Sequence, residues 1–314
     1  MQNKYLIKFS KRFWFWFWTK LMNGFAPSDM QGNYKRPLGI KTDRDYNINH
    51  ENGKIYLLVG NSCPWCHRTL LVYQIKNLFK EVKVIFLKAD IEHGEWIFDD
   101  NFQGSNRLSD FYKKAHENAF FRATLPLLVS LNNNEINILS NESSQITRLL
   151  NSINNKFITQ SKNIQNCNQK ILDLIHYKIS DGVYKCGFAR NQASYERASK
   201  SLFSALSEIE TIISRNKGDW ICGETLTYAD IYLFPTLIRW ELVYSKLFKC
   251  TEKEISDFKN IIEWRLKFFK FSNLHETCFD NEWKKDYYKA LFPLNPNQII
   301  PVLPSLKEIM GLDF

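Results

Sequence analysis

The 314-residue sequence lacks any apolar run long enough to cross a membrane. Its most aromatic stretch, R-F-W-F-W-F-W at 12–18, is far shorter than the roughly 20 apolar residues of a membrane helix, and it lacks the small-residue cleavage site of a signal peptide. We therefore expect no transmembrane segment. The flanking Lys8, Lys11, Arg12 and Lys20 would allow contact with a membrane surface, but we favour docking of the aromatic segment on the protein's own body or on a second subunit.

Cysteine is scarce and lacks an orderly spacing. The seven cysteines stand at 63, 66, 167, 186, 222, 250 and 278. This odd, irregular set argues against a disulfide framework and favours reduced thiols in a cytosol-like compartment. A zinc site would need a second C-x-x-C or H-x-H group beside Cys63 and Cys66, and the sequence contains none. We expect a cytoplasmic protein without a bound metal.

Acidic residues are in the minority. The formal net charge is +9 and the pI is near 9.0, which favours anionic ligands. A nucleic-acid-binding protein also needs a basic stripe on one face or a known module, whereas here Lys and Arg are scattered and no such module is present. We expect no nucleic-acid partner.

The order of the predicted elements indicates two domains. Residues 1–50 carry turn signals and predict an irregular N-terminal extension. Residues 51–155 predict the order β-α-β, a long polar insertion, then β-β-α, which is that of an α/β thioredoxin-like domain. Residues 156–283 predict an all-α C-terminal domain that follows an Asn-rich linker at 152–168, and residues 284–314 predict an irregular tail. The predicted strands are 54–60, 82–88 and 124–130 with a partner behind a turn at 131–135, and the predicted helices are 64–79, 141–151, 164–180, 192–216, 227–247 and 254–270.

Two short signals refine this outline. Pro126 opens the third strand, a position where the preceding peptide bond is commonly cis. Thr227 and Asp230 form a capping box, which predicts a helix start rather than a functional site.

The segment N-S-C-P-W-C-H-R at 61–68 carries the chemistry. It joins a strand to a helix, so Cys63 falls at the helix N-cap and Pro64 at the first helical position, where its missing N–H does no harm. A thiol there faces unpaired backbone N–H groups and the positive end of the helix dipole, both of which favour the thiolate, and we expect Arg68 to help. Cys63 is therefore the predicted nucleophile.

The neighbours of Cys63 are predicted to be secondary. Cys66 lies about one turn inside the helix, where its sulfur is more shielded, so it would at most resolve a mixed disulfide. His67 points away from Cys63, and we interpret it as a helix-surface or interface residue rather than a base.

With these motifs in place, the chain resembles the Xi-class glutathione transferases, the glutathionyl-hydroquinone reductases. The similarity runs from Gly32 to Pro301, and its pieces stand in family order. They are C-P-W-C-H-R-T-L (63–70), G-E-W-I-F (94–98), R-A-T-L-P-L-L (122–128), N-E-S-S-Q-I (141–146), D-G-V-Y-K-C-G-F-A (181–189) and T-L-T-Y-A-D-I-Y-L-F-P-T-L-I-R-W (225–240).

The resemblance implies the glutathione transferase architecture, a homodimer, and reduction of glutathionyl-hydroquinones by glutathione as co-substrate. Cys63 falls on the family's nucleophile and Tyr184 on its proton donor. Tyr244 and Tyr287 fall on tyrosines of the substrate site, although Tyr288 competes with Tyr287 for that role. The family's glutathione-binding positions correspond to Trp96, Arg122, Leu125, Glu142 and Ser143.

Two departures from the family keep a second function open. Cys66 replaces the usual alanine, so a Cys63–Cys66 disulfide could compete with glutathione as the resolving step. The tail D-Y-Y-K-A-L-F-P-L-N-P at 286–296 lacks the family's Ser-His, which leaves the quinone unspecified. The alternative is a glutaredoxin-like thiol transferase or dehydroascorbate reductase that uses Cys63 with Cys66 as the resolving thiol.

Overall fold

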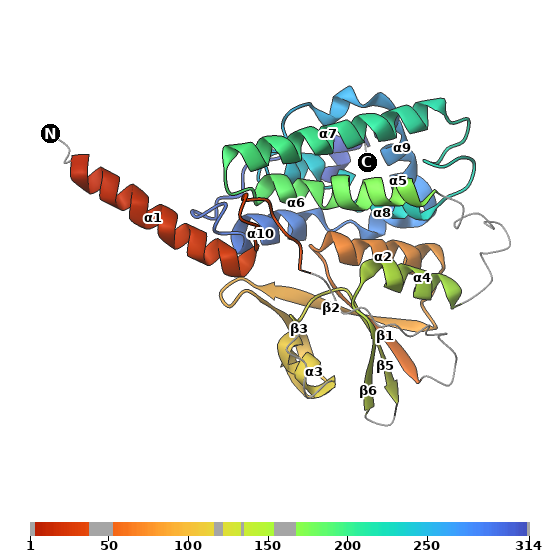
Figure 1. Cartoon of the computed structure of the whole chain (residues 1–314). Coiled ribbons are helices and arrows are strands. Elements are labelled where there is room, and N and C mark those ends of the chain that lie inside the picture. The colour runs from red at the N-terminus through yellow and green to blue at the C-terminus, as the bar shows by residue number, and fades with distance from the viewer. Residues whose placement is uncertain (1–3, 38–52, 116–121, 133–134, 154–167, 313–314) are drawn as a thin grey trace.

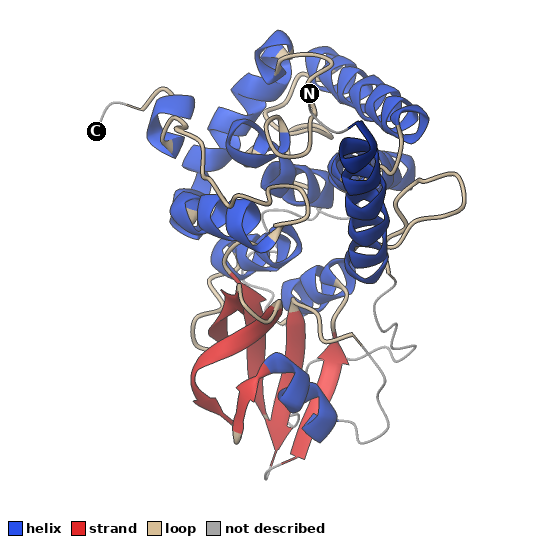
Figure 2. Cartoon of the chain, turned by 90° about the vertical axis from the view of Figure 1, so that its left-hand side faces the viewer, coloured by secondary structure: helices blue, strands red, loops and turns tan. Residues whose placement is uncertain are grey.

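The computed structural model describes residues 4–37, 53–115, 122–132, 135–153 and 168–312. A sheet with its covering helices forms one half of the body, and a bundle of helices forms the other (Figures 1 and 2). The helix α2 lies between the two halves. This arrangement confirms the predicted thioredoxin-like domain followed by an all-helical domain. The predicted linker at 152–168 falls almost entirely outside the described residues.

The sheet has six strands in the order β4-β3-β2-β1-β5-β6. Their bounds are β1 Lys54–Gly60, β2 Val82–Asp90, β3 Glu95–Phe102, β4 Ser105–Arg107, β5 Leu127–Asn132 and β6 Glu135–Ser140. Strand β1 runs parallel to β2 and antiparallel to β5. Its residues Leu57, Leu58 and Val59 are fully buried, as expected of a central strand covered on both faces.

The predicted polar insertion is more structured than the sequence indicated. It contains the strands β3 and β4, which extend the sheet beyond β2, and the helix α3, Leu108–Ala115. The other helices of this half are α2, Pro64–Ile75, and α4, Ser143–Ser152.

The second half is helical. Its elements are α5 Gln169–Asp173, the π-helical turn Leu174–Ser180, α6 Gly182–Gly187, α7 Gln192–Arg215, α8 Tyr228–Leu237, the π-helical turn Trp240–Tyr244, the 3-10 turns Ile255–Asp257 and Phe271–Thr277, α9 Lys259–Lys270, α10 Asp280–Ala290 and α11 Leu306–Ile309. The predicted capping box is confirmed at the start of α8. Thr227 accepts from the Ala229 N–H at 3.2 Å, and Asp230 accepts from the Thr227 N–H at 2.8 Å.

Two segments that we expected to be irregular contain helices. The segment 1–50 contains α1, Lys4–Phe25, and the tail 284–314 contains most of α10. Helix α1 contains no proline and stacks Phe9 on Phe13 one turn apart, which stabilises a helix locally. Helix α10 begins with acidic residues and carries Lys289 in its last turn, in accord with the helix dipole.

A buried polar cluster joins the two halves. His67 of α2 bonds through Nδ1 to Arg239 at 2.9 Å and through Nε2 to the Thr277 hydroxyl at 2.8 Å. The sequence predicted His67 either on the helix surface or at an interface. The structure places it at the interface between the two halves, where it is only 1% exposed. Burial holds the pKa of His67 well below its usual value, so the ring is neutral. Arg239 stacks 3.8 Å from the ring of Trp283, whose Nε1 donates to the Asn61 carbonyl at 3.0 Å.

Candidate active site

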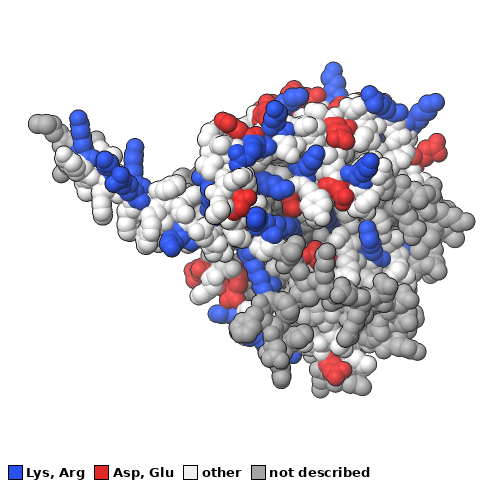
Figure 3. Space-filling model, viewed as in Figure 1, with Lys and Arg blue, Asp and Glu red and all other residues white. Residues whose placement is uncertain are grey.

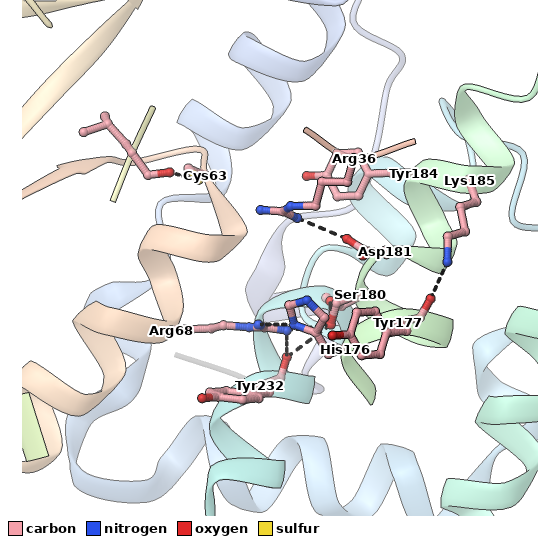
Figure 4. A network of polar contacts seen from close by, with 12 residues as sticks. Arg36, Cys63, Arg68, His176, Tyr177, Ser180, Asp181, Tyr184, Lys185 and Tyr232 are labelled. Carbon is pink, nitrogen blue, oxygen red and sulfur yellow. Dashed lines mark hydrogen bonds and ion pairs between the residues drawn. The ribbon is translucent and has the colours of Figure 1, made fainter. Parts of the chain in front are cut away.

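Cys63 stands where β1 turns into α2. It is the N-cap residue of α2, and Pro64 follows at the start of the helix, as predicted. Its Sγ is partly exposed and donates to the Leu125 carbonyl at 3.8 Å (Figure 4). Leu125 precedes Pro126 through a cis peptide bond, as the sequence indicated. The thiol thus faces the backbone of the segment just before β5.

The environment of Cys63 favours its thiolate. A hydrogen bond from the Cys66 thiol is the main cause that lowers the pKa of Cys63 to about 7, against the opposing effect of burial. The backbone N–H groups of Cys66 and Trp65 and the charge of Arg36 act in the same direction as the Cys66 bond. Burial raises the pKa of Cys66 well above its usual value. Cys66 is thus the more shielded of the two residues, as predicted, while the role of Cys63 as nucleophile stays a prediction.

Arg68 interacts electrostatically with Cys63, in the direction that the sequence predicted. Its guanidinium lies in the interface between the two halves, where it stacks on Trp65 and Tyr232 and donates to the Ser180 hydroxyl at 2.8 Å (Figure 4). Arg36 is a second cation that favours the Cys63 thiolate. It lies 3.4 Å from the centre of the Trp65 ring and pairs with Asp181 at 3.1 Å.

Arg36 was not predicted as a site residue. The sequence could have indicated it, because Arg36 lies in the segment G-N-Y-K-R-P at 32–37, where the family resemblance begins.

The described cysteines include free thiols and one disulfide-bonded residue. The free ones are Cys63, Cys66, Cys186, Cys250 and Cys278. Cys222 is disulfide-bonded, so the expectation of reduced thiols is wrong for this residue. Within the described ranges, no group of three or more His, Cys, Asp or Glu side chains is placed to hold a metal ion.

A cavity of about 620 Å³ opens beside Cys63. Six residues predicted from the sequence line it: Trp96, Arg122, Leu125, Glu142, Ser143 and Tyr184. They come from β3, from the segment just before β5, from the start of α4 and from α6. The fold therefore brings together positions as far apart as 96 and 184. Tyr34, Arg36, Trp65 and Asn141 line the same cavity and were not predicted as site residues.

The cavity combines groups suited to an anionic peptide. Glu142 is the N-cap of α4 and Ser143 its first residue, and both line the cavity, so the positive end of this helix lies at the cavity wall. Arg122 and Arg36 add positive charge to the same wall. Trp96 offers an apolar surface and lies directly against Gly60, where any larger side chain would collide with its ring.

Three tyrosines form a hydrogen-bonded chain behind the cavity. The Tyr184 and Tyr287 hydroxyls are 2.7 Å apart, and those of Tyr287 and Tyr244 are 3.2 Å apart. Tyr288 instead donates to the Leu242 carbonyl at 3.2 Å, so Tyr287 is the one that faces the chain of hydroxyls. Burial raises the pKa of Tyr184 and of Tyr287 well above the usual value, which keeps both protonated at neutral pH.

The lowered pKa of Cys63 gives a pH-dependent prediction. We expect the rate of Cys63 alkylation by iodoacetamide to rise with pH through a midpoint near pH 7, where the thiolate forms. Replacing Cys66 by alanine removes the main group that lowers the pKa of Cys63, so the midpoint should move to higher pH. Mass spectrometry of the Cys63 peptide measures the rate.

A Cys278→Ala variant is the matched control, because burial raises the pKa of Cys278 to about 12 and this thiol bonds to the Leu274 carbonyl. An unchanged midpoint in Cys66→Ala would contradict the role of Cys66.

Comparisons with known proteins agree with this architecture and site. Residues 62–153 match the glutathione S-transferase N-terminal domain, and residues 192–266 match the C-terminal domain. The chain is 30% identical over 278 residues to the glutathionyl-hydroquinone reductase YqjG of Escherichia coli, covering 84% of each chain. It is 31% identical over 273 residues to the reductase PcpF of Sphingobium chlorophenolicum, covering 83% of this chain and 86% of that one.

Solved structures give the same result. The glutathione transferase Xi of Phanerochaete chrysosporium superimposes with a TM-score of 0.77 at 28% identity, covering 88% of this chain and 94% of the other. The glutathione-bound structure of YqjG superimposes with a TM-score of 0.71 at 29% identity, covering 82% of this chain and 88% of the other. The chain therefore belongs to the glutathione transferase family, among its Xi-class glutathionyl-hydroquinone reductases.

Proposed function

We propose that this protein is a glutathione-dependent oxidoreductase that removes glutathione from glutathionyl-hydroquinones, releasing hydroquinone and oxidised glutathione. The observation that carries the proposal is that Tyr184 and Leu125 line one cavity and that Cys63 contacts the carbonyl of Leu125. Cys63, with its pKa lowered to about 7, supplies a nucleophile, and the buried, protonated Tyr184 supplies a proton. The similarity to two reductases named for this activity supports the same reaction.

The cavity residues match the chemical groups of glutathione. Leu125 presents backbone groups that can pair with the cysteinyl part of the tripeptide, as an added strand would. The N–H groups and hydroxyl at Ser143 suit the γ-glutamyl carboxylate, and Glu142 suits the neighbouring ammonium group. Arg122 can hold the second carboxylate, while Trp96 covers the apolar side of the peptide.

The first half-reaction transfers glutathione to the enzyme. The Cys63 thiolate attacks the sulfur of the glutathionyl adduct and forms a mixed disulfide, while the bond between that sulfur and the aromatic carbon breaks. The electron pair of the broken bond stays on the aromatic carbon, which takes a proton from Tyr184 and leaves as hydroquinone. Tyr287 and Tyr244 are placed to stabilise the resulting Tyr184 phenolate through the chain of hydroxyls.

The second half-reaction restores the enzyme. The thiolate of a second glutathione attacks the glutathione sulfur of the mixed disulfide, which releases oxidised glutathione and the Cys63 thiolate. A proton then returns to Tyr184. The test is turnover of a glutathionyl-hydroquinone with glutathione, in which one hydroquinone and one oxidised glutathione appear per substrate consumed. Absence of turnover with a fully alkylatable Cys63 would contradict the proposal.

Glu142 gives a prediction about co-substrate binding. Replacing it by glutamine should raise the KM for glutathione by about tenfold or more, because an ion pair with the ammonium group becomes a neutral contact. The kcat at saturating glutathione should change little. The exposed Glu135→Gln on β6 is the matched control, and steady-state kinetics at varied glutathione measure the effect. A lower kcat with an unchanged KM would contradict this placement of Glu142.

A second activity is supported by the interaction between the Cys66 and Cys63 thiols, which shifts their two pKa values in opposite directions. In this activity Cys66 would attack the mixed disulfide in a glutaredoxin-like thiol transfer or in dehydroascorbate reduction. Loss of these activities in Cys66→Ala, with hydroquinone release intact, would support dual use.

We also propose that the enzyme is a cytoplasmic homodimer. The support is the resemblance to the family, and gel filtration with light scattering tests the oligomeric state. Among the described helices, none is long and apolar enough to pass through a bilayer.

A further inference from the structure

Helix α1 presents apolar side chains that the rest of the structure does not cover. Its 22 residues span about 33 Å and extend away from the body (Figure 1). Only its C-terminal part is anchored: Met22 is fully buried, and the Trp18 Nε1 donates to the Pro293 carbonyl at 2.9 Å. The predicted docking of the aromatic segment on the protein's own body thus holds for Trp18 but not for Phe13 to Phe17, for which docking on a second subunit stays a prediction.

The uncovered side chains are large and aromatic. Phe9 is 67% exposed, Phe13 56% and Phe17 45%, and these three form a stripe at a spacing of four residues. The other exposed apolar residues of the helix are Tyr5, Leu6, Ile7, Trp14, Phe15 and Trp16. An exposed apolar face of this kind marks a surface that binds a partner.

The charge of α1 identifies the partner. Lys4, Lys8, Lys11 and Arg12 stand at i, i+4, i+7 and i+8, so they form a cationic stripe on the side of the helix opposite the phenylalanine stripe. With Lys20 the helix holds five cations and no acidic residue, and so contributes +5 to the formal net charge of +9. Figure 3 shows the basic side chains along the projecting helix without acidic ones among them.

A second copy of the helix is a poor partner for this surface. Two copies of α1 packed through their phenylalanine stripes would cover the apolar side chains but leave both cationic faces without an opposing charge. An anionic lipid surface satisfies both stripes, because aromatic side chains settle at the headgroup and acyl boundary while Lys and Arg meet the phosphate groups.

We propose that α1 lies flat on an anionic membrane surface, with the phenylalanine stripe inserted and the cationic stripe at the lipid phosphates. The inference does not depend on the reaction catalysed, because none of these residues lines the cavity beside Cys63. It places the catalytic body at a membrane surface through a single projecting helix.

The test is flotation of the full-length protein with two kinds of vesicle, phosphatidylcholine alone and phosphatidylcholine with about a third phosphatidylglycerol. We expect binding to the anionic vesicles, weakening as salt is raised. Phe9→Ala, Phe13→Ala and Phe17→Ala combined should reduce the partition coefficient by about tenfold or more, as should Lys4→Gln, Lys8→Gln, Lys11→Gln and Arg12→Gln combined. Alanine and glutamine are good helix formers, so these variants keep α1 helical.

Matched variants elsewhere separate the helix from the rest of the surface. Phe79→Ala, Phe86→Ala and Phe292→Ala combined remove three other exposed phenylalanines. Lys83→Gln, Lys170→Gln, Lys200→Gln and Lys217→Gln combined remove the same number of charges from exposed positions outside α1. Both controls should bind anionic vesicles like the parent.

Three outcomes would overturn the proposal. They are equal binding to both kinds of vesicle, equal losses in the control and α1 variants, and no vesicle binding together with a dimer that the phenylalanine variant dissociates. The last outcome would assign the face to a second copy. Hydroquinone turnover in solution should be unchanged in the α1 variants, which keeps failure of this proposal distinct from failure of the proposed reaction.

Discussion

A Cys63→Ser variant is expected to lose glutathionyl-hydroquinone reduction by at least about a thousandfold in kcat/KM. A serine hydroxyl is far more weakly acidic than a thiol, so the environment that lowers the pKa of Cys63 to about 7 cannot produce a useful alkoxide. The disulfide intermediate also requires sulfur, so the variant lacks the chemistry of both half-reactions. Substrate binding should persist, because Ser143 and the other residues of the cavity wall are unchanged.

The measurement pairs kinetics with mass spectrometry. Turnover of the conjugate should vanish, and treatment with oxidised glutathione should leave the corresponding peptide of the variant unmodified, while the parent acquires one glutathione on Cys63. Cys278→Ser is the matched control, since this cysteine is free and its pKa is raised to about 12 by burial. Turnover near the parental rate in Cys63→Ser would show that another group is the nucleophile.

A Tyr184→Phe variant should lower kcat by about 10²- to 10⁴-fold, the usual contribution of a general acid. The aromatic carbon that leaves Cys63-bound glutathione is a poor leaving group until it receives a proton, and Tyr184 is the cavity hydroxyl that is bonded to the chain of tyrosines. Reduction of glutathione disulfide analogues should be nearly unaffected, because a thiolate leaves without needing that proton. The two substrates together therefore separate a proton donor from a residue that only shapes the pocket.

Tyr288→Phe is the control for this experiment. Tyr288 is buried and loses one hydrogen bond on substitution, that to the Leu242 carbonyl, but it stands outside the chain of Tyr184, Tyr287 and Tyr244. It should retain parental kinetics on both substrates. If Tyr184→Phe slows both substrates equally, the tyrosine acts on binding or structure and the proton must come from elsewhere.

Local chemistry made Cys63 predictable. A strand ending in Gly60, a short turn, and a proline at the start of the helix place the thiol at an N-cap without reference to any distant residue. The proposed glutathione-binding residues could be predicted only through the family resemblance, because nothing local in Trp96 or Glu142 indicates that the fold brings them to one cavity.

The missed features depend on contacts between distant segments. Arg68 was expected to favour the Cys63 thiolate, but its burial against Tyr232 of the second half was not predicted. Arg36 reaches the site from the other direction, through a pair with Asp181 that lies 145 positions away in the chain. The helix α10 was missed because the prolines that follow it dominate the local pattern of the tail.

The hydrogen bond from Trp283 to the Asn61 carbonyl ties the loop that precedes Cys63 to helix α10 of the other half of the protein. Helix α10 follows, in the chain, every residue proposed to bind glutathione. Local unfolding of α10 would therefore release the loop that positions the nucleophile while leaving the sheet intact. We therefore expect catalytic competence to depend on the local stability of α10 as well as on that of the thioredoxin-like core.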